Sequence, residues 1–120
     1  MGRIVIPVAD ERGVILSDHF GRAPYFAWYE IEAGKIVDKG IIPNESEHFG
    51  GSGNPPDRIL QLNPNALITF GMGPRALNIF QNAKVAVLRA NAGTVEEVIR
   101  AYSNDELEEL TEGCHQARHR

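Results

Sequence analysis

The sequence predicts an α/β fold with three layers, α/β/α, around a mixed five-stranded sheet that contains one antiparallel strand. Three observations lead to this prediction. Residues 3–9 form a nearly continuous β-branched run, residues 25–43 resemble a hairpin, and helix and strand patterns alternate from residue 54 onward. Strand–helix–strand units need right-handed parallel crossovers, whereas a hairpin adds a strand that runs the other way. The chain of 120 residues suits one domain, which we expect over residues 1–112 with a polar tail over residues 113–120.

Three strands are expected in the first half of the chain. Residues 3–9 are apolar at almost every position, which is typical of a strand buried on both faces. Residues 25–32 are rich in aromatic side chains, and residues 35–43 follow the turn signal Ala33-Gly34. We therefore expect the second and third runs to pair as a hairpin, followed by a polar, glycine-rich loop.

Helices and strands alternate in the second half. Asn54 and Pro55 are typical of a helix start, and the apolar run 66–70 predicts a central strand. Residues 74–82 carry apolar side chains at helical spacing, and residues 84–88 predict another strand.

Two capping patterns precede the C-terminus. A Thr-x-x-Glu pattern predicts a helix over residues 94–101, and a Ser-x-x-Glu pattern predicts a second, short acidic helix over residues 103–110. The acidic side chains of this second segment are best explained as a solvated helix face.

Composition argues against several classes of function. The formal net charge is −4 and no cluster of Lys and Arg occurs, so we expect no nucleic-acid partner. The apolar runs are far shorter than a bilayer span, so no membrane partner is expected. The residues before the first strand are too few for a signal peptide, which makes the cytoplasm the expected location.

Ligands on sheets of this kind lie beyond the carboxyl ends of the parallel strands. Three loops are expected at that edge, over residues 10–24, 71–74 and 89–93. The first of them holds Asp18, His19 and Arg22 close together. A guanidinium can clamp an anion and an imidazole can ligate a metal or donate a proton. The simpler interpretation is that the two charged side chains pair locally while the imidazole is solvated.

The second loop is a candidate anion site. Gly71 and Gly73 permit unusual backbone angles and a close approach of the ligand, the helix that follows offers free N–H groups, and Arg75 comes at once. A plain tight turn between strand and helix is the alternative. The loop matches neither a phosphate-binding loop of the Gly-Lys-Ser/Thr type nor a dinucleotide fingerprint. The candidate cofactor-binding residues are Arg22, Gly71, Met72, Gly73 and Arg75.

The candidate metal ligands are few. They are His19, His48, Cys114, His115 and His119. His115 and His119 are four positions apart and would share one face of a helix, but the paired cysteines of a structural zinc site are absent. A loose terminus with incidental histidines is the alternative interpretation of the last segment.

No catalytic constellation is found in the sequence. Ser17, Asp18 and His19 are adjacent and cannot form the spatial relay of a catalytic triad. Cys114 has no fixed base beside it. We therefore expect no enzymatic activity.

Two motifs together carry a family resemblance. Residues 17–26, which include the sequence FGRA, and residues 71–77, GMGPRAL, resemble the dinitrogenase iron–molybdenum cofactor biosynthesis family. The resemblance continues at residues 48–51 and through residues 84–88 and 94–99, so it covers nearly the whole chain. This family includes NifX-type carriers and the C-terminal domain of NifB-type proteins.

The resemblance implies a ribonuclease H-like fold and a role, related to nitrogen fixation, in binding or transferring iron–sulfur or iron–molybdenum cofactor precursors. It implies that Arg22, Gly71 and Gly73 line the pocket edge and that His19 and His48 are ligands from two facing loops. It also implies proteins that donate or accept the cofactor, and a homo-oligomer remains open. One cysteine holds a cluster weakly, so no tightly bound cofactor is expected after purification in air.

Two alternatives to the carrier remain at this point. One is a metal-free binding or regulatory module for a small anionic ligand, held by arginines and the glycine turn. The other is a hydrolase, which would rest on fold analogy alone.

Overall fold

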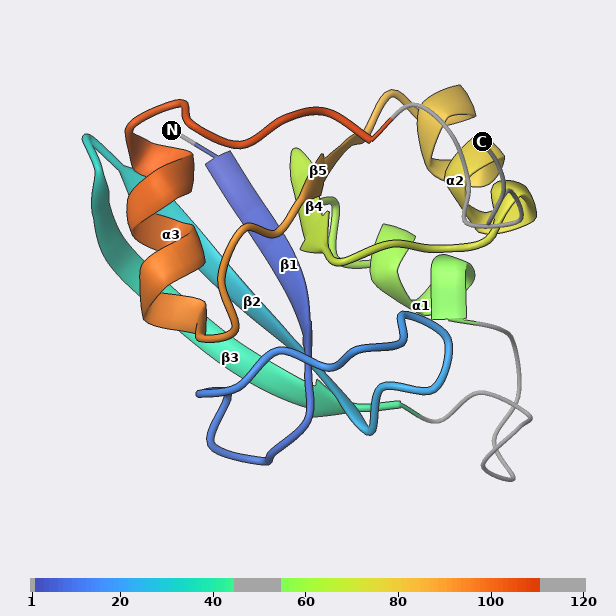
Figure 1. The fold of residues 1–120 in the computed structure, drawn as a ribbon, viewed down its shortest axis with the longest axis horizontal. Coiled ribbons are helices and arrows are strands. Elements are labelled where there is room, and N and C mark those ends of the chain that lie inside the picture. The colour runs from blue at the N-terminus through green and yellow to red at the C-terminus, as the bar shows by residue number, and fades with distance from the viewer. Residues whose placement is uncertain (1, 45–54, 111–120) are drawn as a thin grey trace.

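The computed structural model describes residues 2–44 and 55–110. Five strands and three helices follow one another along these residues (Figure 1). They are β1 (Gly2–Val8), β2 (Tyr25–Glu32), β3 (Lys35–Pro43), α1 (Pro55–Leu60), β4 (Ala66–Thr69), α2 (Pro74–Asn82), β5 (Ala86–Arg89) and α3 (Val95–Ser103). None of the helices in the described residues has the length and apolarity needed to cross a membrane.

The strands form one sheet in the order β3-β2-β1-β4-β5. β2 is antiparallel to both of its neighbours, whereas β1, β4 and β5 pair in parallel. The prediction of a mixed five-stranded sheet with one antiparallel strand is confirmed. The hairpin is confirmed as well, because Ala33 and Gly34 form its tip with φ of 53° and 79°, the angles of a type I′ turn.

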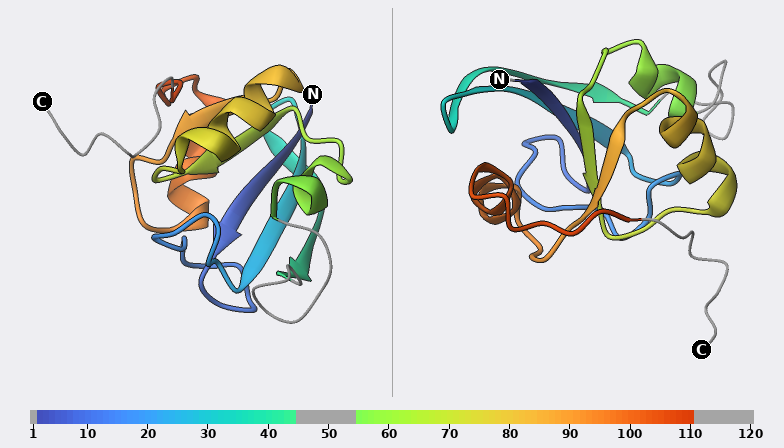
Figure 2. Two further views of the ribbon diagram at one scale, coloured as in Figure 1. Left: turned by 90° about the vertical axis from the view of Figure 1, so that its right-hand side faces the viewer. Right: turned by 90° about the horizontal axis from the view of Figure 1, so that it is seen from above.

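Helices cover both faces of the sheet, which gives the three layers seen from above in Figure 2. On one face, Val95, Val98 and Ile99 of α3 pack against alternate side chains of the strands. On the other face, Ile59 of α1 and Phe80 of α2 join a second buried cluster. Two apolar clusters on opposite faces explain why the central strands are apolar at nearly every position.

The side chain of Trp28 on β2 packs closely against a glycine on the neighbouring strand β3. Trp28 lies opposite Gly40 of β3, and a Cβ added to Gly40 would come within 2.5 Å of the indole nitrogen. The guanidinium of Arg3 covers the indole ring at 4.8 Å from the ring centroid, and its Nε donates to Glu30 at 2.9 Å. The indole therefore occupies the space that any larger residue at position 40 would need.

Gly40→Ala is therefore expected to lower the free energy of unfolding by about 1–3 kcal/mol, because the indole must move. This reverses the usual small gain when alanine replaces glycine in a strand. Gly93→Ala is the control, since a Cβ at Gly93 meets no atom within 4 Å. Urea unfolding of both variants measures the difference, and equal stability of the two would contradict the expectation.

Two of the differences from the predictions arise because two helices end in a Schellman motif. Lys84, predicted as strand, follows the C-cap of α2 with φ of 64°, and the next N–H, of Val85, donates to Phe80 O at 2.9 Å. Asp105 has φ of 58°, and the N–H of Glu106 donates to Ala101 O at 2.9 Å. The predicted acidic helix over residues 103–110 is therefore wrong.

The acidic segment instead lies along the edge of β5. The N–H of Arg89 donates to Glu108 O at 2.8 Å, and the N–H of Leu110 donates to Val87 O at 2.7 Å. Leu110 is buried in the cluster beneath α1 and α2. An edge strand has unpaired backbone groups, and this segment satisfies those of β5.

The first part of the loop after β1 is held by a carboxylate. Oδ1 of Asp10 accepts from the backbone N–H groups of Val14 and Ile15 at 3.0 and 3.1 Å. The hydrogen bond from Ile15 is the main reason that the pKa of Asp10 lies below its usual value near 3.8. Burial, and then the charge of Asp10, raise the pKa of Tyr29, whose hydroxyl donates to Gly13 O at 3.4 Å.

The lowered pKa of Asp10 predicts a pH-dependent contribution to stability. A carboxyl with a lower pKa in the folded state stabilises the fold above its unfolded pKa, and this contribution is lost as pH falls through the folded pKa. Asp10→Ala is therefore expected to lower the free energy of unfolding by about 1 kcal/mol at neutral pH, and the deficit should shrink below about pH 4. Urea unfolding between about pH 3 and pH 7 measures it; a deficit that grows toward low pH would contradict the assignment.

Candidate functional site

A pocket lies where the loops after β1 and β4 diverge. β1 and β4 are parallel neighbours. The chain leaving β1 returns through β2 on one side, whereas the chain leaving β4 crosses through α2 to β5 on the other. Such a switch point at the carboxyl ends of parallel strands leaves a crevice between the two loops.

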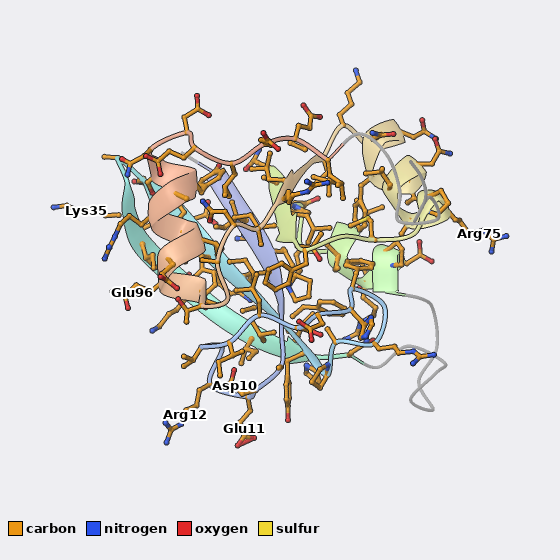
Figure 3. The ribbon with its side chains drawn as sticks, in the orientation of Figure 1. Asp10, Glu11, Arg12, Lys35, Arg75 and Glu96 are labelled. Carbon is orange, nitrogen blue, oxygen red and sulfur yellow. The ribbon has the colours of Figure 1, made fainter. Side chains whose placement is uncertain are left out.

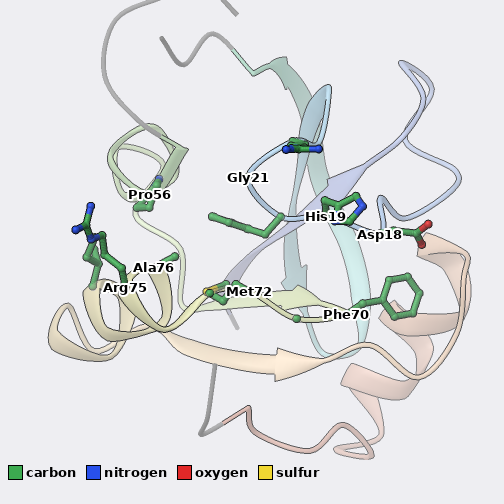
Figure 4. A pocket seen from close by; sticks show the side chains of 13 residues that line it. Asp18, His19, Gly21, Pro56, Phe70, Met72, Arg75 and Ala76 are labelled. Carbon is green, nitrogen blue, oxygen red and sulfur yellow. The ribbon is translucent and has the colours of Figure 1, made fainter. Parts of the chain in front are cut away.

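A pocket of about 650 Å³ occupies this crevice. Figure 4 shows Asp18 and His19 on one wall, Arg75 at the opposite rim, and Met72 between them. The lining residues are Asp18, His19, Phe20, Gly21, Arg22, Pro56, Phe70, Gly71, Met72, Gly73, Arg75, Ala76 and Ile79. A volume of this size is typical of small-molecule and cofactor sites.

The wall from the β1–β2 loop is anchored on both sides of His19. The Ser17 hydroxyl accepts from the His19 N–H at 3.2 Å and donates to the His19 carbonyl at 3.0 Å. Phe20 is buried and meets the ring of Phe80 edge-on at 5.7 Å and that of Phe26 at 5.9 Å. His19 therefore lies between two anchors with its own side chain exposed.

Hydrogen bonds from Asn44 fix the backbone of the next part of the same wall. Its side-chain amide donates to the carbonyls of Gly21 and Ala23 at 3.2 and 2.8 Å. Its backbone N–H donates to the carbonyl of Pro24 at 2.9 Å. Arg22 lies inside the segment that these bonds fix.

The wall from β4 and α2 has a similar anchor. The hydroxyl of Thr69, a fully buried residue, donates to the carbonyl of Gly71 at 3.3 Å. Met72, the next residue along the loop, is also buried. Gly71 and Gly73 do not use the left-handed angles that glycine permits, because the positive-φ glycines of the described residues are Gly13 and Gly34. A Cβ at Gly73 would meet nothing within 4 Å, so this glycine leaves the backbone open to a ligand.

The charges at the pocket favour an anion. Arg22 and Arg75 both line it and are exposed, against one carboxylate, that of Asp18. Figure 3 shows Arg75 extending outward from the start of α2. α2 begins without a side-chain cap and with Pro74 at its first position, so its first N–H groups remain available for a ligand.

The structure brings together one group of the predicted site residues. Arg22, Gly71, Met72, Gly73 and Arg75 all line the pocket, as does His19. His48, Cys114, His115 and His119 lie outside the described residues. The third predicted loop does not line the pocket in the described structure, because Gly93 instead accepts from the N–H of Leu16 at 3.0 Å. Within residues 2–44 and 55–110, no group of three or more His, Cys, Asp or Glu side chains could hold a metal ion.

Sequence reasoning missed two kinds of site residue. Asn44 and Thr69 anchor the walls from positions that carried no motif. Phe70, predicted as strand, lies one residue beyond β4 at the pocket with 38% of its surface exposed. The sequence has no local signal for this role, because Phe70 continues the apolar run 66–70 and its exposure is seen only in the folded chain.

Comparisons with known proteins agree over nearly the whole chain. The sequence profile of the family described as "Dinitrogenase iron-molybdenum cofactor" matches residues 2–105. An uncharacterised protein of Methanocaldococcus jannaschii is 32% identical over 110 residues, which cover 90% of this chain and 91% of that protein.

Solved structures give the same result for the fold. A Thermotoga protein with a provisional NifB assignment is 32% identical and superposes with a TM-score of 0.73, covering 92% of this chain and 95% of that one. The apo form of the orange protein from Desulfovibrio gigas superposes with a TM-score of 0.79, covering 93% and 95% of the two chains. At 18% identity, the second comparison shows a shared fold alone.

Proposed function

Because this chain belongs to the dinitrogenase iron–molybdenum cofactor family, we propose that its pocket binds an anionic metal–sulfur species, a precursor of an iron–sulfur or iron–molybdenum cofactor, and passes it to another protein. The proposed role is that of a non-catalytic carrier. The observation that carries it is that Arg22, Arg75 and the start of α2 all border one pocket of about 650 Å³.

Four apolar residues line the pocket, and we call them its floor: Phe20, Met72, Ala76 and Ile79. This apolar floor favours a sulfur-rich anion over a small oxyanion as the ligand. A compact oxyanion such as phosphate would lose strong hydration on such a floor, and that loss is unfavourable. A larger, more polarisable metal–sulfur species loses less, and the thioether of Met72 is a soft group of the kind such metals accept.

The pocket offers few side chains that could bind a metal, which suits a cargo that is bound weakly. Among the described pocket residues, His19 and Met72 are the side chains with a nitrogen or sulfur atom suited to a soft metal. Charge and backbone N–H groups would therefore contribute most of the binding, which suits cargo that must leave again. His48, Cys114, His115 and His119 remain proposed ligands on sequence grounds.

The test is anaerobic purification with iron and sulfide analysis and a visible spectrum, before and after incubation with iron and sulfide. We expect stoichiometric iron and sulfide with a charge-transfer band, and weaker retention after His19→Ala or Cys114→Ala. Asn91→Ala, an exposed position outside the pocket, is the matched control. Wild-type protein that stays colourless and metal-free would overturn the carrier proposal.

A metal-free module for a small anion is the second candidate function. The same arginines and helix start favour it, and the apolar floor counts against it. Calorimetry with phosphate, nucleotides and molybdate separates the two, because the module predicts heat with at least one of these anions without iron or sulfide.

The resemblance also leads us to propose that the fold is ribonuclease H-like, with one domain over residues 1–112. The sheet order and the helices on both faces support this. A hydrolase of that fold needs clustered carboxylates around a divalent metal, and the described residues offer no such cluster.

A further inference from the structure

Buried polar side chains are concentrated under the pocket. Of the Ser, Thr, Asn, Gln and charged residues that the structure describes, three are buried: Ser17, Asn44 and Thr69. Each of them hydrogen-bonds the backbone of a pocket wall, Ser17 at His19, Asn44 at Gly21 and Ala23, and Thr69 at Gly71.

The three residues also share one place in the fold. Thr69 is the last residue of β4, Asn44 directly follows β3, and the N–H of Ser17 donates to Pro7 O near the end of β1 at 3.0 Å. β1, β3 and β4 run in the same direction, because β2 is antiparallel to both of its neighbours. The three side chains, which we call the polar layer, therefore lie at the carboxyl ends of these strands, and each is bonded to the backbone of a pocket wall.

This placement is informative because a buried polar group is unfavourable unless it is hydrogen-bonded. Elsewhere in the described residues, the two faces of the sheet are packed with apolar side chains. The walls above the layer are irregular loops whose side chains at Asp18, His19 and Arg22 are exposed. Such loops sample many conformations unless the interior fixes their backbone.

We propose that Ser17, Asn44 and Thr69 are positioning residues that fix both walls of the pocket before a ligand arrives. His19 and Arg22 are held from one side, and the glycine turn that precedes Arg75 is held from the other. A pre-organised pocket loses little conformational entropy on binding, so ligand affinity depends on residues that need not touch the ligand. The binding test of this inference rests on the proposed function. The structural test, which follows the backbone of the two walls without a ligand, does not depend on that function.

The structural measurement is backbone amide hydrogen exchange in the ligand-free full chain. The amide of Leu77, which donates to Gly73 O at 3.1 Å, reports on the α2 wall, and the amide of Ala23, which donates to Phe20 O at 3.4 Å, reports on the other. Thr69→Val keeps the side-chain shape and removes the hydroxyl. It is expected to speed exchange at Leu77 about tenfold relative to amides of β1, and Ser17→Ala and Asn44→Ala should do the same at Ala23.

Two controls separate positioning from a general loss of stability. Thr69→Ser keeps the donor and should restore slow exchange at Leu77. Val98→Ala removes volume from the fully buried core beneath α3, on the other face of the sheet. It should destabilise the whole chain without a selective effect at Ala23 or Leu77. If the three variants change these amides no more than Val98→Ala does, the proposal is wrong.

The binding measurement is the iron and sulfide retained after anaerobic incubation and desalting. Thr69→Val and Asn44→Ala should retain less than Thr69→Ser and Val98→Ala at a temperature where all four are folded. Equal retention in all four overturns the positioning role. If wild-type protein retains none, the carrier function fails, and hydrogen exchange alone decides whether the three residues fix the walls.

Discussion

Phe80→Ala is expected to lower the free energy of unfolding by about 3–5 kcal/mol, the largest stability effect that we predict. Phe80 is fully buried and contacts Phe20 edge-on at 5.7 Å. Alanine would remove the contacts that Phe80 makes in the buried cluster of α1 and α2 and would leave a cavity there, although Leu77 remains. Since domains of this size are stable by roughly 5–15 kcal/mol, we expect a melting temperature lower by roughly 10–20 °C.

Phe70→Ala is the control for Phe80→Ala, because it removes the same group from a site that is 38% exposed. It should change stability far less, and Phe80→Leu should fall between the two because much of the volume remains. Calorimetry and urea unfolding measure all three. A loss below about 1 kcal/mol in Phe80→Ala would mean that the cluster around Phe20 does not hold α2 in place.

Arg22→Gln is expected to weaken binding of the anionic cargo by about 10- to 100-fold, the value of one charge-assisted hydrogen bond. Arg22 lines the pocket, and the hydrogen bonds from Asn44 to Gly21 and Ala23 fix the backbone on both sides of it. Arg22→Lys should recover only part of the affinity, because an ammonium lacks the planar fork of donors. Binding should also weaken as salt increases.

Arg12→Gln is the matched control for Arg22→Gln. Arg12 lies on the same loop, is exposed and does not line the pocket. In Figure 3 it extends to the lower left of the molecule, whereas Arg75 extends to the right. Both substitutions change the net charge equally, so a purely long-range attraction would make them equivalent. Asp18→Asn removes the carboxylate at the rim and should raise affinity a few-fold. Equal retention of iron and sulfide by Arg12→Gln and Arg22→Gln would exclude a direct role for Arg22.

The sequence predicted correctly those helices and turns that depend on residues within one short segment. Residues 74–82 were predicted as a helix and form α2 with those bounds, because Pro74 and the helical spacing of apolar side chains are read within one segment. The turn at Ala33 and Gly34 was predictable for the same reason. The errors at Lys84 and Asp105 arose because a left-handed residue after a helix is usually glycine, and neither lysine nor aspartate signals it.

The anchors of the pocket could not be predicted from local patterns. Asn44 is one polar residue at the start of a polar stretch, and its function depends on carbonyls about 20 positions earlier in the chain. In the sequence, Thr69 resembles any β-branched strand residue. Only the structure shows that its hydroxyl donates to the carbonyl of Gly71. The motifs indicated which loops meet, whereas the contacts that hold those loops exist only in the folded chain.

The divergence of the two pocket loops has a consequence for how occupancy could be sensed. One wall belongs to the first part of the chain and the other to the second part, so cargo that touches both acts as a removable cross-link between distant segments. A ligand that binds only the folded state stabilises that state by an amount that grows with ligand concentration relative to the dissociation constant. If the proposed cargo binds in this way, loaded molecules should unfold less often than empty ones and should therefore be more resistant to proteolysis.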